Sequence, residues 1–105
     1  MLVYKILRRP EWDELLAAGE SLGAPVDRAD GFIHFSTADQ LAETLAKHFA
    51  GETGLVVLAV DAEVDGFAWE PSRGGALFPH LYRPLGRADV LWAKPLGEID
   101  LGVLA

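Results

Sequence analysis

The chain has 105 residues, half of them apolar, no cysteine, and a net charge of −7 at pH 7. This length predicts a single domain, residues 1–105, with one hydrophobic core, and the composition argues against disorder. The absence of cysteine excludes disulfides and thiolate chemistry and favours a cytoplasmic protein, and the acidic charge argues against extended contact with nucleic acid or an anionic membrane. No apolar run approaches the roughly 20 residues of a membrane span.

The first third of the chain predicts a strand, a helix and a loop. Residues 2–7 are rich in aliphatic and aromatic side chains, which is typical of a strand. Pro10 opens the helix at a position where its missing amide costs nothing, and Gly19 ends it. We expect residues 23–29 to form a loop that leads to a central strand.

The central stretch, residues 30–40, predicts a strand that carries His34 and then turns into a helix of residues 38–49. Thr37 with Gln40 fits a capping box, and Ser36 is an alternative cap. His34 is therefore expected near a strand end with a helix N-terminus beside it, where amides and the helix dipole favour an anion. Ser36 and Thr37 are candidate ligand contacts.

The second half of the chain predicts a series of strands. The six apolar residues 55–60 predict a strand covered on both faces, followed by a short strand ending at Glu70. Further strands are expected over residues 78–82, 88–93 and 101–105.

The segment of residues 71–96 differs in charge from the rest of the acidic chain. It carries four cations against one acid, and they are Arg73, Arg83, Arg87, Lys94 and Asp89. Either this is chance, or the segment forms a local anion-attracting face. On the second interpretation Arg73, Gly74 and Gly75 bind an anion, because two glycines let backbone amides approach a ligand closely, and Arg83 adds a further cation.

Three side chains suggest a nucleotide site. At period two, His80 and Tyr82 share one face of their predicted strand, and with His34 they supply imidazole and phenol groups that orient a ribose or stack on a base. Alternatively His34 is a structural histidine that bonds to the backbone. Glu70, between an apolar strand and the glycine-rich turn, is either a general base or an exposed carboxylate.

Other chemistries are not indicated by spacing. Asp30, His34, Glu70 and His80 could together form a metal site, but no two of them have the close spacing of a metal-ligand pair, so we assign no metal ligand. The nucleophile elbow, the dinucleotide fingerprint and the P-loop are absent.

Two blocks of the sequence resemble a known family. Asp-Gly-Phe-Ile-His-Phe-Ser at residues 30–36 followed by Gln40, and Phe-Pro-His-Leu-Tyr at residues 78–82, resemble the bacterial and plant family catalogued as domain of unknown function 952. The resemblance covers nearly the whole chain and implies a compact relative of the ADP-ribosyltransferases. In those enzymes a histidine, an aromatic residue and often a glutamate hold NAD, so His34, then Tyr82 or His80, and Glu70 are the positions implied.

The sequence therefore predicts an α+β domain with a mixed, mostly antiparallel split sheet and two main helices, similar to ADP-ribosyltransferases. We expect it to bind NAD or a related nucleotide in a cleft between His34 and His80, with transfer or hydrolysis at the ribose. The alternatives are a non-catalytic module for a nucleotide or other small anion, and a metal-assisted hydrolase that uses both histidines. Turnover and oligomeric state stay open.

Overall fold

The computed structural model describes residues 1–104, apart from the side chain of Arg73. Its helices are α1 (Arg9–Ala18), α2 (Pro25–Asp30), α3 (Ala38–His48) and α4 (Leu101–Leu104), with 3-10 turns η1 (Arg73–Gly75), η2 (Arg87–Asp89) and η3 (Leu96–Glu98). The strands are β1 (Leu2–Leu7), β2 (Glu20–Ser21), β3 (Ile33–His34), β4 (Val56–Asp61), β5 (Phe67–Pro71), β6 (Leu77–Leu81), β7 (Leu85–Gly86) and β8 (Val90–Pro95). Among the described helices, none combines the length and apolar character that a bilayer crossing requires.

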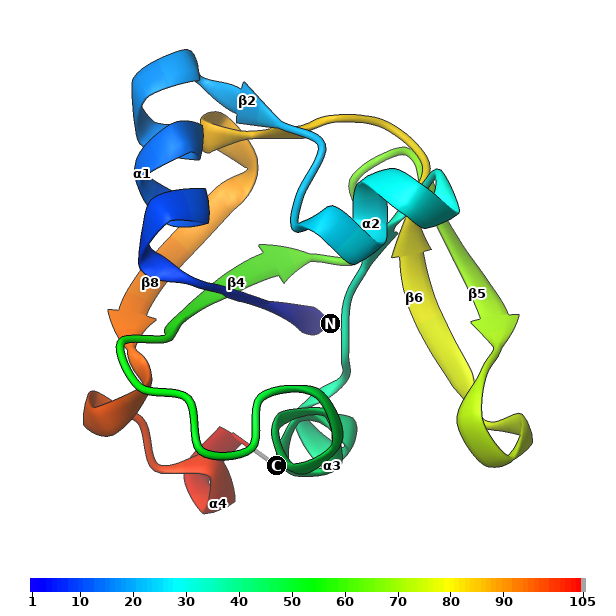
Figure 1. Ribbon diagram of the computed structural model, residues 1–105. Coiled ribbons are helices and arrows are strands. Elements are labelled where there is room, and N and C mark those ends of the chain that lie inside the picture. The colour runs from blue at the N-terminus through cyan, green and yellow to red at the C-terminus, as the bar shows by residue number, and fades with distance from the viewer. Residues whose placement is uncertain (105) are drawn as a thin grey trace.

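Within residues 1–104 the strands form three sheets, and the strand pairs in them are antiparallel. One sheet has the order β1-β4-β8, a second has β3-β6-β5, and β2 pairs with β7. Figure 1 shows β4 and β8 on one side of the molecule and β5 and β6 on the other. The predicted α+β class with antiparallel strands is confirmed, and α1 and α3 are the two main helices.

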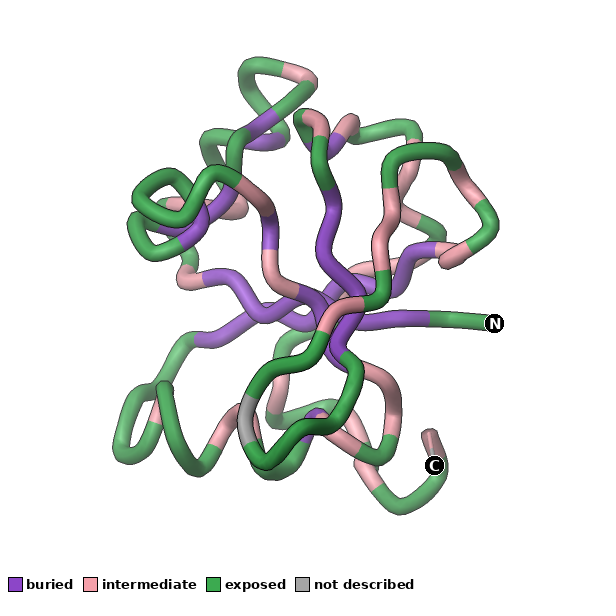
Figure 2. The backbone as a smooth tube through the Cα atoms, turned by 90° about the vertical axis from the view of Figure 1, so that its right-hand side faces the viewer, coloured by how far each residue is buried: buried purple, intermediate pink, exposed green. Residues whose placement is uncertain are grey.

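Strand β4 of the β1-β4-β8 sheet is buried on both faces, as the apolar run at residues 55–60 predicted, and its neighbour β1 is buried apart from Leu2. Alternate residues such as Val3 and Leu58 join a cluster that includes Leu15 of α1. Their neighbours, such as Tyr4 and Val57, join a second cluster with Leu41 of α3 and the C-terminal residues. Figure 2 shows the buried backbone gathered at the centre of the molecule, with exposed loops around it.

One end of each main helix lies where the sequence indicates. Gly19 follows α1 in the left-handed conformation, with φ of 83°, and its amide donates to the Leu15 carbonyl. Thr37 caps α3, because its hydroxyl accepts from the amide of Gln40 while the Gln40 side chain accepts from the amide of Thr37.

A short extended segment after β3 joins the two larger sheets. Phe35 donates its amide to the carbonyl of Pro79, beside β3–β6 pairing. The next residue, Ser36, exchanges both backbone hydrogen bonds with Tyr4 of β1, at 2.8 and 2.9 Å. The segment that carries His34 is therefore fixed between the two sheets.

Two predicted elements are wrong. Residues 23–29 are not wholly a loop, because α2 begins at Pro25, where the Asp27 carboxylate accepts from the Ala24 amide, and it ends at Gly31. Residues 101–104 are helical rather than extended, since Leu101 and Leu104 pack on the cluster beneath α3. The predicted central strand is also shorter than expected, because regular pairing is limited to Ile33 and His34.

Candidate functional site

The strand register places the two histidines opposite each other. His34 of β3 pairs with His80 of β6, and their ring centroids are 5.4 Å apart with planes at 69°. Phe32 lies against both rings, 4.7 Å from His34 and 4.2 Å from His80. The expected convergence of these two histidines, which lie 46 positions apart in the chain, is thus a consequence of one antiparallel pairing.

Both histidines line a cavity of about 640 Å³. This volume lies within the range of small-molecule sites, which is roughly 300–1,000 Å³. Its wall combines residues of β1, α2, β6 and the C-terminal half of α3 with the segment of His34 and Ser36. Its aromatic side chains are Tyr4, Phe35, Phe49 and Phe78, and its cations and imidazoles are Lys5, Arg8, His34, His48 and His80. Glu11 and Asp30 are its acids.

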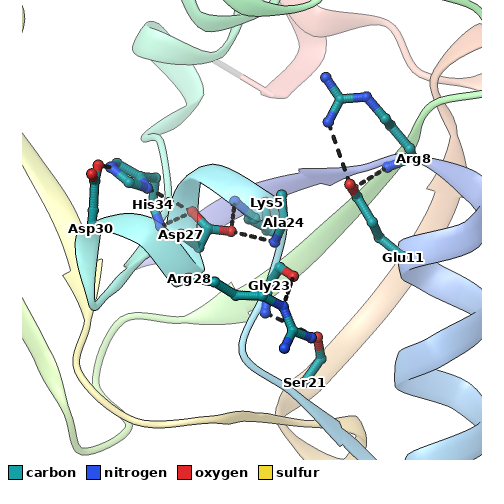
Figure 3. Close-up of polar contacts among 10 residues, drawn as sticks. All are labelled: Lys5, Arg8, Glu11, Ser21, Gly23, Ala24, Asp27, Arg28, Asp30 and His34. Carbon is teal, nitrogen blue, oxygen red and sulfur yellow. Dashed lines mark hydrogen bonds and ion pairs between the residues drawn. The ribbon is translucent and has the colours of Figure 1, made fainter.

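His34 is held at both ring nitrogens. Nδ1 lies 2.6 Å from Oδ1 of Asp27, and Nε2 lies 3.0 Å from Oδ2 of Asp30 (Figure 3). The backbone amide of His34 also donates to Asp27 Oδ1, at 3.0 Å. Carboxylates only accept hydrogen bonds, so each ring nitrogen of His34 faces a hydrogen-bond acceptor. This arrangement fixes the orientation of the imidazole on the cavity wall.

Asp27 is the centre of this network, and its side chain is fully buried. Its other oxygen, Oδ2, lies 2.7 Å from Nζ of Lys5 and accepts from the amide of Ala24 at 2.7 Å. Burial favours the neutral acid, but the hydrogen bond from His34 and the charge of Lys5 outweigh it and lower the pKa of Asp27. Burial lowers the pKa of Lys5, with the Asp27 carboxylate acting in the opposite direction.

His80 is held at one nitrogen only by the described protein. Its Nδ1 lies 2.8 Å from Oε1 of Glu70, and the hydroxyl of Tyr82 donates to the same oxygen at 2.6 Å. The hydrogen bond from Tyr82, followed by the one from His80, lowers the pKa of Glu70. The bond to Glu70 in turn raises the pKa of Tyr82. Glu70 contacts His80, and Tyr82 contacts Glu70, but neither Glu70 nor Tyr82 is among the described residues that line the cavity.

The hydroxyl groups at the start of α3 divide between capping and the cavity. Thr37 caps the helix and does not line the cavity, whereas Ser36 does. The hydroxyl of Thr44 donates to the carbonyl of Gln40, and Ser36 Oγ lies 2.8 Å from Thr44 Oγ1. Since the Thr44 proton is used, Ser36 donates to Thr44 and its own oxygen keeps lone pairs for a ligand hydroxyl.

Arg83, Gly74 and Gly75, which the sequence suggested as ligand contacts, lie away from the cavity wall. Arg83 forms two hydrogen bonds with Asp89, at 2.8 and 3.2 Å, and does not line the cavity. Gly74 and Gly75 shape the turn between β5 and β6, with φ of 66° and 82°, and are likewise not on its wall. The side chain of Arg73 lies outside the described residues. Among the described residues of this turn, Ser72 lines the cavity.

No group of three or more His, Asp or Glu side chains among the described residues is arranged to hold a metal ion. The four residues considered for a metal site form two separate pairs, in which Asp30 contacts His34 and Glu70 contacts His80. Each histidine therefore has a carboxylate partner that orients its ring.

Sequence reasoning missed Lys5 and Asp27, and both left a signal. Lys5 interrupts a strand that is otherwise apolar on both faces, so its ammonium needs a buried partner. Asp27 follows Pro25 by two positions, where an acidic side chain can close the first turn of a helix. Phe32, which stacks against both histidines, was treated only as a strand residue.

The fold and the cavity define a small α+β domain in which two paired histidines of the β3-β6-β5 sheet line one cavity. The chain belongs to the family described as Protein of unknown function (DUF952), whose model matches residues 6–93. It is 52% identical to protein CC0527 from Caulobacter crescentus, whose crystal structure aligns with a TM-score of 0.88 over 95% of this chain and 89% of that one. The solution NMR structure of the same protein aligns with a TM-score of 0.81 and 55% identity, over 90% and 84% of the two chains.

No significant match was found among curated proteins. The descriptions of the matched structures name no ADP-ribosyltransferase and no activity. These matches therefore show the family and the fold of this chain.

Proposed function

We propose that this protein is a compact relative of the ADP-ribosyltransferases that binds NAD or a related nucleotide in the His34–His80 cavity and acts at the ribose. The observation that carries the proposal is that two oriented imidazoles lie on the wall of one cavity of about 640 Å³. The absence of cysteine supports a cytoplasmic location for this activity.

The wall suits the nucleoside part of such a ligand. Aromatic side chains, Tyr4 and Phe49 among them, offer surfaces on which a base can stack. Ser36 offers an acceptor for a ribose hydroxyl, because its proton is donated to Thr44. These neutral groups select a sugar and a base rather than charge alone.

The phosphates would meet cations that already have partners. Arg8 bonds to Glu52 through two nitrogens, at 2.8 and 3.1 Å, and also contacts Glu11. Lys5 is paired with Asp27. An incoming pyrophosphate would therefore compete with carboxylates for Arg8, and we expect its affinity contribution to fall at high salt.

Isothermal titration calorimetry with NAD, ADP-ribose, AMP and inorganic pyrophosphate tests this proposal. We expect NAD and ADP-ribose to bind more tightly than pyrophosphate, because the wall recognises the nucleoside. Ser36→Ala should weaken NAD binding about three- to tenfold, as expected for one hydrogen bond. Thr53→Ala, at an exposed position away from the cavity, is the matched control. Failure of every nucleotide to bind at millimolar concentration would refute the proposal.

The non-catalytic alternative is separated by mass spectrometry of the same mixtures. Release of nicotinamide from NAD indicates an enzyme, whereas intact NAD after prolonged incubation indicates a binding module.

A further inference from the structure

The two cavity histidines differ in the availability of a ring nitrogen. His34 contacts a carboxylate oxygen at both nitrogens, at 2.6 and 3.0 Å. His80 contacts Glu70 through Nδ1 at 2.8 Å, and none of the described protein atoms forms a hydrogen bond with its Nε2. An imidazole acts as a base through an unprotonated nitrogen. His80 therefore keeps one ring nitrogen without a partner among the described protein groups, whereas both nitrogens of His34 have one.

The Glu70 carboxylate determines which nitrogen of His80 carries the proton. Tyr82 donates to Oε1 of Glu70, and the same oxygen faces Nδ1 of His80. These hydrogen bonds lower the pKa of Glu70, so the group is a carboxylate at neutral pH and can only accept. Nδ1 must then carry the hydrogen, and in the neutral ring the lone pair stands on Nε2.

The His80 ring is also fixed in position. Phe32 stacks on it, with centroids 4.2 Å apart and planes at 27°, and His34 meets it edge-on. Only 5% of the His80 surface is exposed, yet the residue lines the cavity. A general base gains from this combination, because its orientation is set before the ligand arrives.

We propose that His80 is the catalytic general base of the cavity and that Glu70 is its positioning residue, in a reaction that cleaves the nicotinamide–ribose bond of NAD with water. The inference rests on the proposed function and deepens it by assigning the proton transfer. It also moves Glu70 from the role implied by the family resemblance, at the reacting ribose, to the support of His80.

The step balances without any further reactant. Nε2 of His80 takes a proton from water, and the water oxygen forms a bond to C1′ of the ribose. The bond between C1′ and the ring nitrogen of nicotinamide breaks, and its electron pair stays on that nitrogen, which loses its positive charge. Neutral nicotinamide and ADP-ribose leave, and His80 releases its proton to solvent.

The first experiment needs no ligand. Long-range ¹H–¹⁵N correlation spectra report which nitrogen of a histidine carries hydrogen, and we expect Nδ1–H at His80 in the native protein. Glu70→Gln should preserve this tautomer, because its amide oxygen still accepts, and Glu70→Ala should lose it. An Nε2–H tautomer in the native protein would overturn the inference.

The second experiment separates binding from turnover. His80→Asn keeps a donor toward Glu70 and removes the base, so NAD binding measured by calorimetry should change less than about threefold while nicotinamide release falls by at least about 100-fold. Glu70→Ala should lower release by about tenfold or more, with Glu70→Gln restoring most of it. Thr53→Ala, an exposed position away from the cavity, should match the native protein.

The outcomes distinguish the two proposals. A His80→Asn variant with native turnover overturns the assignment of the base and leaves the proposed function standing. NAD that binds to the native protein without release of nicotinamide overturns the catalytic inference and leaves NAD binding in the cavity standing. Absence of NAD binding overturns the proposed function and the inference together. If His80→Asn does not fold, the tautomer of the native protein and the Glu70 pair of variants still decide the question.

Discussion

Replacing Asp27 with alanine should be among the most destabilising single changes in this chain. The substitution removes the partner of Lys5, whose side chain is only 6% exposed, together with acceptors for the amides of Ala24 and His34. Breaking a buried ion pair by removing one member costs about 3–5 kcal/mol. For a domain whose total stability is about 5–15 kcal/mol, this is a large share.

Urea denaturation followed by circular dichroism measures the effect. The matched control is Glu14→Ala, which removes a surface ion pair with Arg28 in which the side chains are 51% and 44% exposed. An exposed pair contributes about 0–1 kcal/mol, so the control should remain near the native stability. A loss below about 1 kcal/mol for Asp27→Ala, at an unchanged denaturant slope, would refute the reasoning.

A double-mutant cycle isolates the ion pair from the hydrogen bonds. Lys5→Met leaves Asp27 with its contacts to Ala24 and His34, so the second change should cost less in that background than in the native protein. We expect a coupling of about 1–3 kcal/mol, and strict additivity would contradict a direct interaction.

The pH dependence of the same measurement has a defined sign. The folded pKa of Asp27 lies below its ordinary value of 3.8. Its contribution to stability is therefore fully present above that ordinary value and is lost as the pH falls through the folded pKa. The difference in stability between the native protein and Asp27→Ala should shrink in strong acid.

Three further changes probe the rest of the site. His34→Ala should lower the free energy of unfolding by about 1–3 kcal/mol, because the buried Asp27 carboxylate loses a hydrogen bond. The same variant should weaken NAD binding ten- to a hundredfold, which is about 1.4–2.8 kcal/mol. Native stability together with native affinity would contradict both roles. Tyr82→Phe should raise the pKa of Glu70 toward its ordinary value, since the hydrogen bond from the phenol is the main cause of the lowered pKa. A ¹³C titration of the Glu70 carboxyl carbon measures this pKa, and an unchanged value would disprove the expectation. Thr37→Ala should cost about 0.5–2 kcal/mol in thermal or urea unfolding through loss of the helix cap, and an unaltered midpoint would argue against capping.

Local patterns were enough to predict the main elements of the fold. The run at residues 55–60 became β4, buried on both faces, and Thr37 with Gln40 became the cap of α3. Such signals depend on neighbours in sequence. The wrong assignment at residues 101–104 shows the limit, because a short apolar run fits a strand or a helix and its packing beneath α3 decided the outcome.

The site was predictable only where two motifs happened to pair. The antiparallel register of β3 and β6 places His34 beside His80, and motif recognition had already grouped these residues. Lys5 of β1 reaches Asp27 of α2, and no local pattern in the sequence states which strand packs against α2. Arg83 is the opposite case: its charge suggested a ligand contact, and in the structure its guanidinium is paired with Asp89.

The buried contact of Lys5 with Asp27, and of Asp27 with His34, has a consequence for how this family can diversify. A chain that lost the lysine would bury an unbalanced carboxylate, and a chain that lost the carboxylate would bury an unbalanced ammonium. Exchange at one position therefore favours exchange at the other. Across an alignment of family members, positions 5 and 27 should change together, and variation at position 34 should accompany theirs.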